Sequence, residues 1–143
     1  MIYKKSWKYI LKYSHDFYYR PMALKDFSDV AKGDLGGFVT SYHNLSQKGN
    51  CWIYNCASII RNAHVSEDAQ IRDRVVVSGC ARIFGNAKIS ENAKIYRNAE
   101  ISGNSRVCGD ARVKDYANIS GCVIISGNAK IKNQTLIKGV YSE

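Results

Sequence analysis

A six-residue period governs the last ninety residues of the chain and runs without an insertion. Every sixth residue from Ile53 to Ile137 is Ile or Val. The residue four places further on is usually Ala, and the two residues before that Ala are rich in Gly, Asn and Asp. A period this short, repeated fifteen times, is typical of a solenoid in which each copy adds the same small unit.

Six residues are enough for one short strand and one bend. The branched aliphatic residue points inward from the strand, and its two neighbours point outward. Ala fits the corner, where the interior narrows, and Gly, Asn or Asp in the bend tolerate left-handed backbone angles. Three units close a triangular coil of eighteen residues, so the fifteen units predict five coils and a prism about 24 Å tall.

The repeat from Ile53 to Ser142 resembles the hexapeptide-repeat proteins that form left-handed parallel β-helices. The resemblance implies an all-β fold, with a left-handed parallel β-helix of about five triangular coils over residues 51–143. The last coil departs most from the repeat, and terminal repeats differ when they close an open core or meet a partner. We therefore expect a homo-oligomeric contact at this end, made by Leu136, Val140 and Tyr141.

Residues 1–50 hold ten of the sixteen aromatic side chains and read differently from the repeat. Alternating aromatic and basic residues predict a strand from Trp7 to Tyr13, and a second strand is expected from Phe17 to Ala23. We expect an aromatic-rich β cap that covers the exposed strand edges of the first coil. The stretch from Ala23 to Trp52, with its GDLGGFV and NLSQKGNCW segments, resembles the lead-in of hexapeptide-repeat proteins from phages and prophages.

Composition favours a soluble protein. The chain has no run of eighteen apolar residues and no signal-peptide core, so we expect no membrane association and a cytoplasmic location, in the host cell if the protein is phage-encoded. The five cysteines are an odd number without CxxC spacing, which argues against a disulfide framework and a zinc site. No metal or cofactor is expected, because the motifs that bind them are missing. The net charge of +9 favours attraction to polyanions.

The repeat register assigns each charged side chain to one face of the coil, and cations gather on one face. In its last three coils the outward positions hold five cations, one tyrosine and no acid. Such a face suits a phosphate backbone, with bases stacking on the aromatic ring. The alternative is that the cations keep the sheet soluble and block edge pairing. The predicted nucleic-acid-binding residues, including one in the adjacent bend, are Lys94, Tyr96, Arg97, Arg112, Lys114, Lys130 and Lys132.

The aromatic and basic residues of the cap form a second candidate surface. Interleaved rings and cations serve as stacking platforms and as protein-binding surfaces. The alternative is that a small cap needs large side chains to bury enough apolar area. The predicted partner-binding residues are Trp7, Lys8, Tyr9, Lys12, Tyr13, Tyr18 and Arg20.

Many left-handed β-helix proteins are acyltransferases, which typically use a histidine as general base and bind acyl-coenzyme A or acyl carrier protein between subunits. The repeat here has no loop insertion that would shape a substrate pocket, and the three histidines fall in separate segments. His64, beside Ser66 and one coil from Arg82, is the best candidate for a catalytic base. We nevertheless expect a non-catalytic protein.

The sequence therefore favours a phage-type binding protein whose basic face engages RNA or a nucleoprotein complex. Such a protein could inhibit a host defence system, such as a CRISPR effector, by occupying it. An acidic protein surface is a second partner with complementary charge. Two alternatives remain: a structural or oligomeric scaffold that stacks through its coil ends, and a hexapeptide-repeat acyltransferase.

Overall fold

Each six-residue unit folds into one short strand followed by a bend, in a computed structural model that describes residues 6–143. In β11 (Lys94–Ile95), Lys94 is exposed and Ile95 is fully buried. Arg97 in the next bend has a φ of 59°, and Gly, Asn, Asp or Glu takes the same left-handed conformation in most other bends. Ala99 is fully buried at the following corner. The alternation of inward and outward positions predicted from the repeat is confirmed as far as Ile131. In the last turn the prediction is wrong, because Leu136 pairs with Ile119 and packs against the core while Ile137 is 62% exposed.

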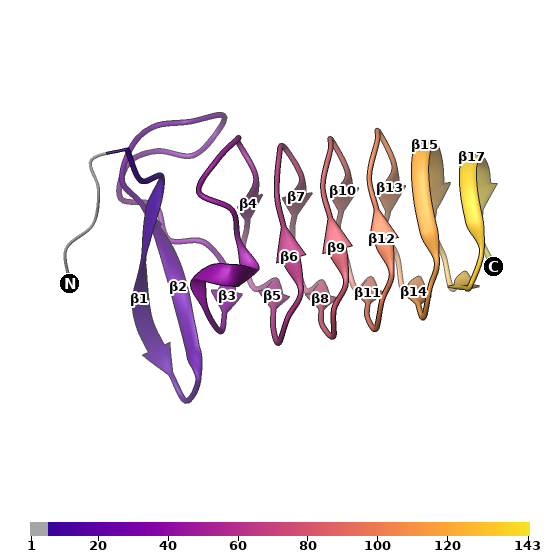
Figure 1. Ribbon diagram of the computed structural model, residues 1–143, viewed down its shortest axis with the longest axis horizontal. Helices are drawn as coiled ribbons and strands as arrows, with labels where there is room; N and C mark the ends of the chain where they lie inside the picture. The colour runs from indigo at the N-terminus through magenta and orange to yellow at the C-terminus, as the bar shows by residue number, and fades with distance from the viewer. Residues whose placement is uncertain (1–5) are drawn as a thin grey trace.

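Three units complete one turn, so residues eighteen apart, such as Lys94 and Arg112, lie side by side on parallel strands. The turns stack along one axis between the N-terminal hairpin and the C-terminus (Figure 1). The first face contains β3 (Phe38–Val39), β5 (Ser58–Ile59), β8 (Val76–Val77), β11, β14 (Arg112–Lys114) and β16 (Lys130–Lys132). The second face contains β4 (Trp52–Ile53), β7 (Gln70–Ile71), β10 (Lys88–Ile89), β13 (Arg106–Val107) and the second half of β15 (Asn118–Ile125). The third face contains β6 (His64–Val65), β9 (Arg82–Ile83), β12 (Glu100–Ile101) and the first half of β15, and β17 (Thr135–Tyr141) pairs along both halves of β15.

The first face has six stacked parallel strands, from β3 to β16, so the solenoid has about six turns where the repeat predicts five. The additional turn lies in the lead-in. β3 pairs in parallel with β5, so Val39 lies beside Ile59, and Leu45 lies beside Val65 in the same way. These partners are twenty residues apart instead of eighteen, because the loop before Trp52 contains two further residues. The solenoid therefore begins inside the segment that the sequence assigned to the cap and lead-in.

The core is a column of Ile and Val side chains from the three faces, with Ala at the corners. Most of these side chains are fully buried, and Ile131 near the C-terminal end is 5% exposed. Burial of each large aliphatic side chain stabilises the fold by about 1.5–3 kcal/mol. Where Ser105 replaces a corner Ala, its buried hydroxyl accepts the backbone N–H of Val123. Ser105 at this corner therefore leaves no buried hydroxyl without a hydrogen bond.

The N-terminal cap is an antiparallel hairpin of β1 (Tyr9–His15) and β2 (Tyr18–Ala23), close to the two predicted strands. β2 pairs with β3 in antiparallel orientation, where Tyr19 lies beside Val39. The hairpin therefore extends the first face into an eight-stranded sheet and covers its first strand edge. A short 3-10 helix, η1 (Tyr42–Asn44), lies in the lead-in. Within residues 6–143 no helix has the length and apolar character that a membrane span requires.

Lys8 and Tyr9 lie inside the cap instead of on the partner-binding surface predicted from the sequence. Lys8 is 1% exposed, and its Nζ donates to the carbonyl oxygens of Gly49 and Cys51 at 3.2 and 2.8 Å and to Cys51 Sγ at 3.3 Å. Burial lowers the pKa of the Lys8 ammonium and raises the pKa of the Cys51 thiol. The Tyr9 hydroxyl donates to the carbonyl oxygen of Leu45. Both side chains therefore tie the hairpin to the start of the solenoid.

The C-terminal end of the described chain is formed by β17, which pairs with β15. Leu136 and Tyr141 pack partly against the core, whereas Val140 is 71% exposed. Ile137 is also exposed, at 62%, so this end carries apolar surface. The oligomeric contact expected here stays a prediction.

Candidate nucleic-acid interface

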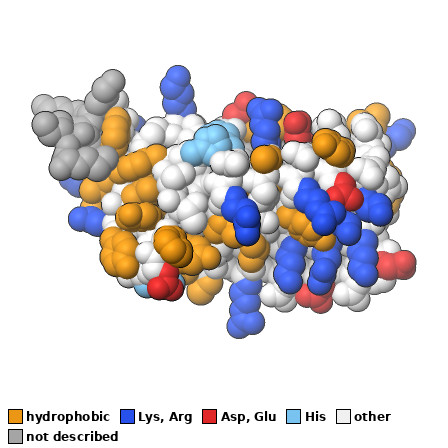
Figure 2. Space-filling model, turned by 60° about the horizontal axis from the view of Figure 1, so that its bottom comes forward, with side chains coloured by type: hydrophobic (Ala, Val, Ile, Leu, Met, Phe, Trp, Pro, Cys, Tyr) orange, Lys and Arg blue, Asp and Glu red, His pale blue; other side chains and the backbone are white. Residues whose placement is uncertain are grey.

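The predicted basic residues lie together on the first face, in the strands nearest the C-terminal end. Lys94, Arg112 and Lys130 occupy the same outward position on β11, β14 and β16, so they form one row of register partners. Lys114 and Lys132 form a second row on β14 and β16. These five residues are called the basic ladder below. Figure 2, in which the lower side of Figure 1 comes forward, shows basic side chains gathered over this half of the solenoid.

Among the described residues no acid lies within 4 Å of a ladder cation, although Asp115 at the edge of the face attracts Lys114 and Lys132 at longer range. The ion pairs of the described residues join Arg72 to Asp29, Arg82 to Glu100, and Arg97 to Asp115. Neighbouring rungs are one strand spacing apart at the backbone, and two like charges at about 4.8 Å repel by roughly 0.9 kcal/mol in water. The ladder contains three such neighbouring pairs. An anionic partner would offset this repulsion.

Acidic side chains in the bends are engaged by the solenoid itself. Asp73 accepts the backbone N–H of Glu91 at 2.9 Å, and Glu91 accepts that of Gly109 at 2.6 Å, one turn further along. Arg97 donates to Asp115 at 2.7 Å, and this hydrogen bond holds the pKa of the Asp115 carboxyl below its usual range. Arg97, which the sequence assigned to nucleic-acid binding, is therefore paired at the edge of the face.

Tyr96 is the aromatic member of this face and lies half-buried beside the ladder. Its ring centroid is 5.8 Å from the Arg97 guanidinium carbon and 5.9 Å from Lys114 Nζ. Both cations are close enough for cation–π attraction. A ring flanked by cations can stack on a base while the cations contact neighbouring phosphates.

The remaining predicted partner-binding residues of the cap divide between the two sides of the hairpin. Lys12 and Arg20 are register partners on the side that continues the outer surface of the first face. Tyr13 is 66% exposed and packs edge-on against Tyr19, on the other side, with ring centroids 5.8 Å apart. Trp7 is half-buried and packs edge-on against a tyrosine ring of η1 at 5.6 Å. The hairpin therefore offers no single surface that holds all the predicted residues.

Two histidines that are distant in the sequence come together at the third face. His43 in η1 and His64 in β6 have ring centroids 5.1 Å apart. His64 Nδ1 donates to the carbonyl oxygen of His43, and His43 Nε2 donates to that of Asn62 at 3.1 Å. Because a carbonyl oxygen only accepts, a neutral His64 keeps its lone pair on Nε2. The additional turn in the lead-in, which the repeat does not reveal, creates this pair.

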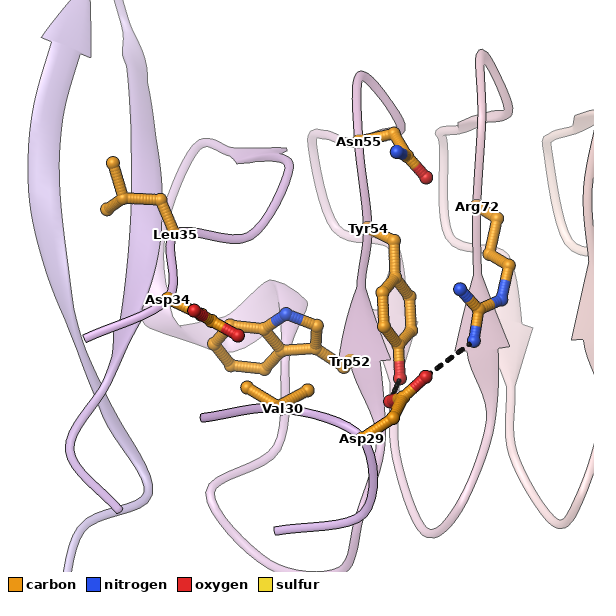
Figure 3. A pocket seen from close by; sticks show the side chains of 8 residues that line it. All are labelled: Asp29, Val30, Asp34, Leu35, Trp52, Tyr54, Asn55 and Arg72. Carbon is orange, nitrogen blue, oxygen red and sulfur yellow. Dashed lines mark hydrogen bonds and ion pairs between the residues drawn. The ribbon is translucent and has the colours of Figure 1, made fainter. Parts of the chain in front are cut away.

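A polar pocket of about 310 Å³ lies where the loop between β2 and β3, called the cap loop below, meets the second face (Figure 3). Asp29 accepts hydrogen bonds from the Tyr54 hydroxyl at 2.6 Å and from the Arg72 guanidinium at 3.2 Å. The guanidinium also lies 3.8 Å from the Tyr54 ring centroid. The Tyr54 hydrogen bond, aided by Arg72, lowers the pKa of Asp29. Because the two charges pair with each other, we interpret the cluster as an attachment of the cap loop to the coil.

No protein-family model matches the chain. Over 59 residues, 41% of this chain, the sequence is 37% identical to the uncharacterized acetyltransferase YdcK of Escherichia coli (strain K12). The match spans 18% of that protein, so the chain covers less than a fifth of this relative's length. The similarity contradicts the expectation of a non-catalytic protein, because the name of the relative points to an enzyme.

Proposed function

We propose that the basic ladder binds the phosphate backbone of a nucleic acid, with RNA as the first candidate. The observation that carries the proposal is the row of register-paired cations at Lys94, Arg112 and Lys130, which has no ion-pair partner among the described residues. Solubility alone would be served as well by alternating signs, which attract across strands instead of repelling. Cations without acids in register are the arrangement that a polyanion completes.

The requirement for an exposed phosphate backbone limits the kinds of partner that the ladder can bind. Free RNA has the required charge, and so does a nucleoprotein complex that exposes its RNA. The resemblance of the lead-in to phage and prophage proteins supports a host nucleoprotein, such as a CRISPR effector, as that complex. In this proposal the rigid face occupies the RNA and thereby inhibits the complex. An acidic protein would satisfy the ladder but would bring no base to stack on Tyr96.

Binding of a labelled single-stranded RNA should depend steeply on salt. Five phosphate contacts on a single strand correspond to a slope of about −3.5 in log K against log salt, or roughly a 100-fold loss between 50 and 200 mM. Changing all five ladder residues to Ser should remove most of this slope, because the released counterions are those of the contacted phosphates. Fluorescence anisotropy across a salt series measures both proteins. Equal binding by the two proteins, or none by either, would make the ladder a solubility device.

The similarity to a protein named as an acetyltransferase favours a second candidate function, the transfer of an acetyl group. Acyl transfer needs a general base that accepts the proton of the attacking group. The backbone carbonyl of His43 fixes the tautomer of His64, so that Nε2 carries the lone pair. We propose His64 as this base, with acetyl-coenzyme A as the donor.

Replacing His64 with Ala should lower the turnover of acetyl-coenzyme A by about 10²–10⁴-fold, the usual contribution of a positioned general base. The release of free coenzyme A, measured with a panel of amine and hydroxyl acceptors, reports this turnover. His15→Ala is the matched control, because His15 lies on the cap hairpin, away from the histidine pair. Turnover that survives in His64→Ala, or that is absent from the wild type, would exclude this function.

A further inference from the structure

The sheet that carries the basic ladder continues without a break into the cap. Its strand order is β1-β2-β3-β5-β8-β11-β14-β16. Tyr19 pairs with Val39, whose side chain is buried in the core, so Tyr18 and Arg20 on either side of Tyr19 point outward with Phe38. The cap and the ladder therefore share one outer surface. Figure 2 shows hydrophobic side chains gathered toward the cap end and basic side chains toward the other end.

Three rings form an open notch at the cap end of this surface. The ring centroid of His15 is 5.4 Å from that of Tyr18 and 5.7 Å from that of Phe38. The Tyr18 and Phe38 rings are 6.2 Å apart and nearly perpendicular, and the Arg20 guanidinium lies 5.2 Å from the Phe38 ring. The pocket at the rings, called the aromatic notch below, has a volume of about 270 Å³ and is lined by His15, Tyr18, Phe38, Cys56 and Ser58.

A short neutral stretch joins the aromatic notch to the basic ladder. In the row of register partners that links them, Phe38 is followed by Ser58, Val76 and then Lys94. The two intervening side chains are small and uncharged, so they neither block nor repel a chain that crosses them. The distance from β3 to β11 is three strand spacings, or about 14 Å.

We infer that this surface is a track for single-stranded nucleic acid, with phosphates on the basic ladder and an unpaired base in the aromatic notch. The inference rests on the proposed function of the ladder and adds the strand state of the ligand. A base inside a duplex is already stacked and paired, whereas an unpaired base can be splayed out and stacked on an exposed ring. Lys12 and Arg20 beside the notch supply cations for the phosphate next to that base.

The test compares three probes on the full chain: a single-stranded RNA, a duplex RNA of the same length and inorganic polyphosphate. Tyr18→Ser should weaken binding of the single strand by about 5–150-fold, the range for loss of one stacked base. Binding of the duplex and of polyphosphate should stay unchanged, because they use the ladder alone. Tyr18→Phe should retain wild-type affinity, since it keeps the ring. Phe17→Ser is the matched control, because Phe17 is an exposed aromatic residue in the turn of the same hairpin and does not line the notch.

Thermal unfolding confirms that each variant keeps its fold before the titrations are compared. If the single strand binds equally well to wild type and Tyr18→Ser, or if duplex binding falls by the same factor, the inference is overturned. In that case the Ser-substituted ladder variant still decides the proposed function separately. If only the ladder variant loses RNA binding, the inference of a single-strand track is wrong and the proposed function of the ladder stands. If neither variant loses RNA binding, both proposals are wrong.

Discussion

Reversing two neighbouring rungs of the basic ladder, Arg112→Glu together with Lys130→Glu, should weaken binding of single-stranded RNA by roughly 10²–10³-fold near 100 mM salt. Arg112 and Lys130 are exposed register partners on β14 and β16. The reversal removes two attractions and adds two repulsions on β14 and β16, the last two strands of the ladder. Anisotropy titrations at several salt concentrations measure the loss and should show that it shrinks as salt screens the surface.

The second face offers a control with the same change of charge. Lys88 and Arg106 are exposed register partners on β10 and β13. Lys88→Glu with Arg106→Glu also lowers the net charge from +9 to +5, since 9 − 4 = 5. Because these residues lie on another face, the control should lose less than about 5-fold in affinity at a salt concentration where the Debye length is about 10 Å. Equal losses in the two double variants would show that net charge attracts the RNA without a defined site.

The outward positions of the solenoid as far as β16 could be predicted from the sequence because the repeat has no insertion there, whereas the strand register slips in the last turn. A six-residue unit and three units per turn place Lys94 beside Arg112 by arithmetic alone, and the structure pairs these residues. From Ile53 to Ile131 the inward strand positions are branched aliphatic residues, so a register shift of one residue would expose the core. The ladder therefore follows from the period and needs no long-range information.

The cap and the histidine pair could not be predicted in this way, because their geometry depends on contacts between distant segments. Because the loop before Trp52 contains two further residues, the six-residue period does not extend back through it. The repeat therefore does not identify Val39 and Leu45 as core positions. Because the repeat does not reveal that additional turn, it does not predict that His43 lies beside His64.

Lys8 shows the same limit in the cap. It sits in an alternating aromatic and basic segment that suggests an exposed cation, yet its partners come from Gly49 and Cys51, about forty residues away in the chain. Only the folded lead-in provides those carbonyl oxygens, so alternation alone misplaces the side chain.

Replacing Ile95 with Asp should destabilise the protein by more than about 4 kcal/mol, because a carboxylate would be placed in a core without a cationic partner. Ile95 is fully buried in the middle of the solenoid, where it lies between Val77 and Val113. Ile95→Ala, which leaves a cavity but no charge, should cost about 2–5 kcal/mol and stay folded. Urea unfolding followed by circular dichroism measures the free energy of unfolding of each variant.

Lys94→Asp is the matched control, since Lys94 precedes Ile95 on the same strand and points the other way. It should change stability by less than about 0.5 kcal/mol, because the side chain is exposed. The two Asp variants thus test the register on which the ladder depends. A stable Ile95→Asp protein and an unstable Lys94→Asp protein would mean that the strands are turned by one residue, which would put the ladder cations in the core and remove the binding face. The expected result is an unstable Ile95→Asp protein and a stable Lys94→Asp protein, which would place the cations on the surface. A loss of RNA binding in the ladder variants would then be due to lost contacts and not to a lost fold.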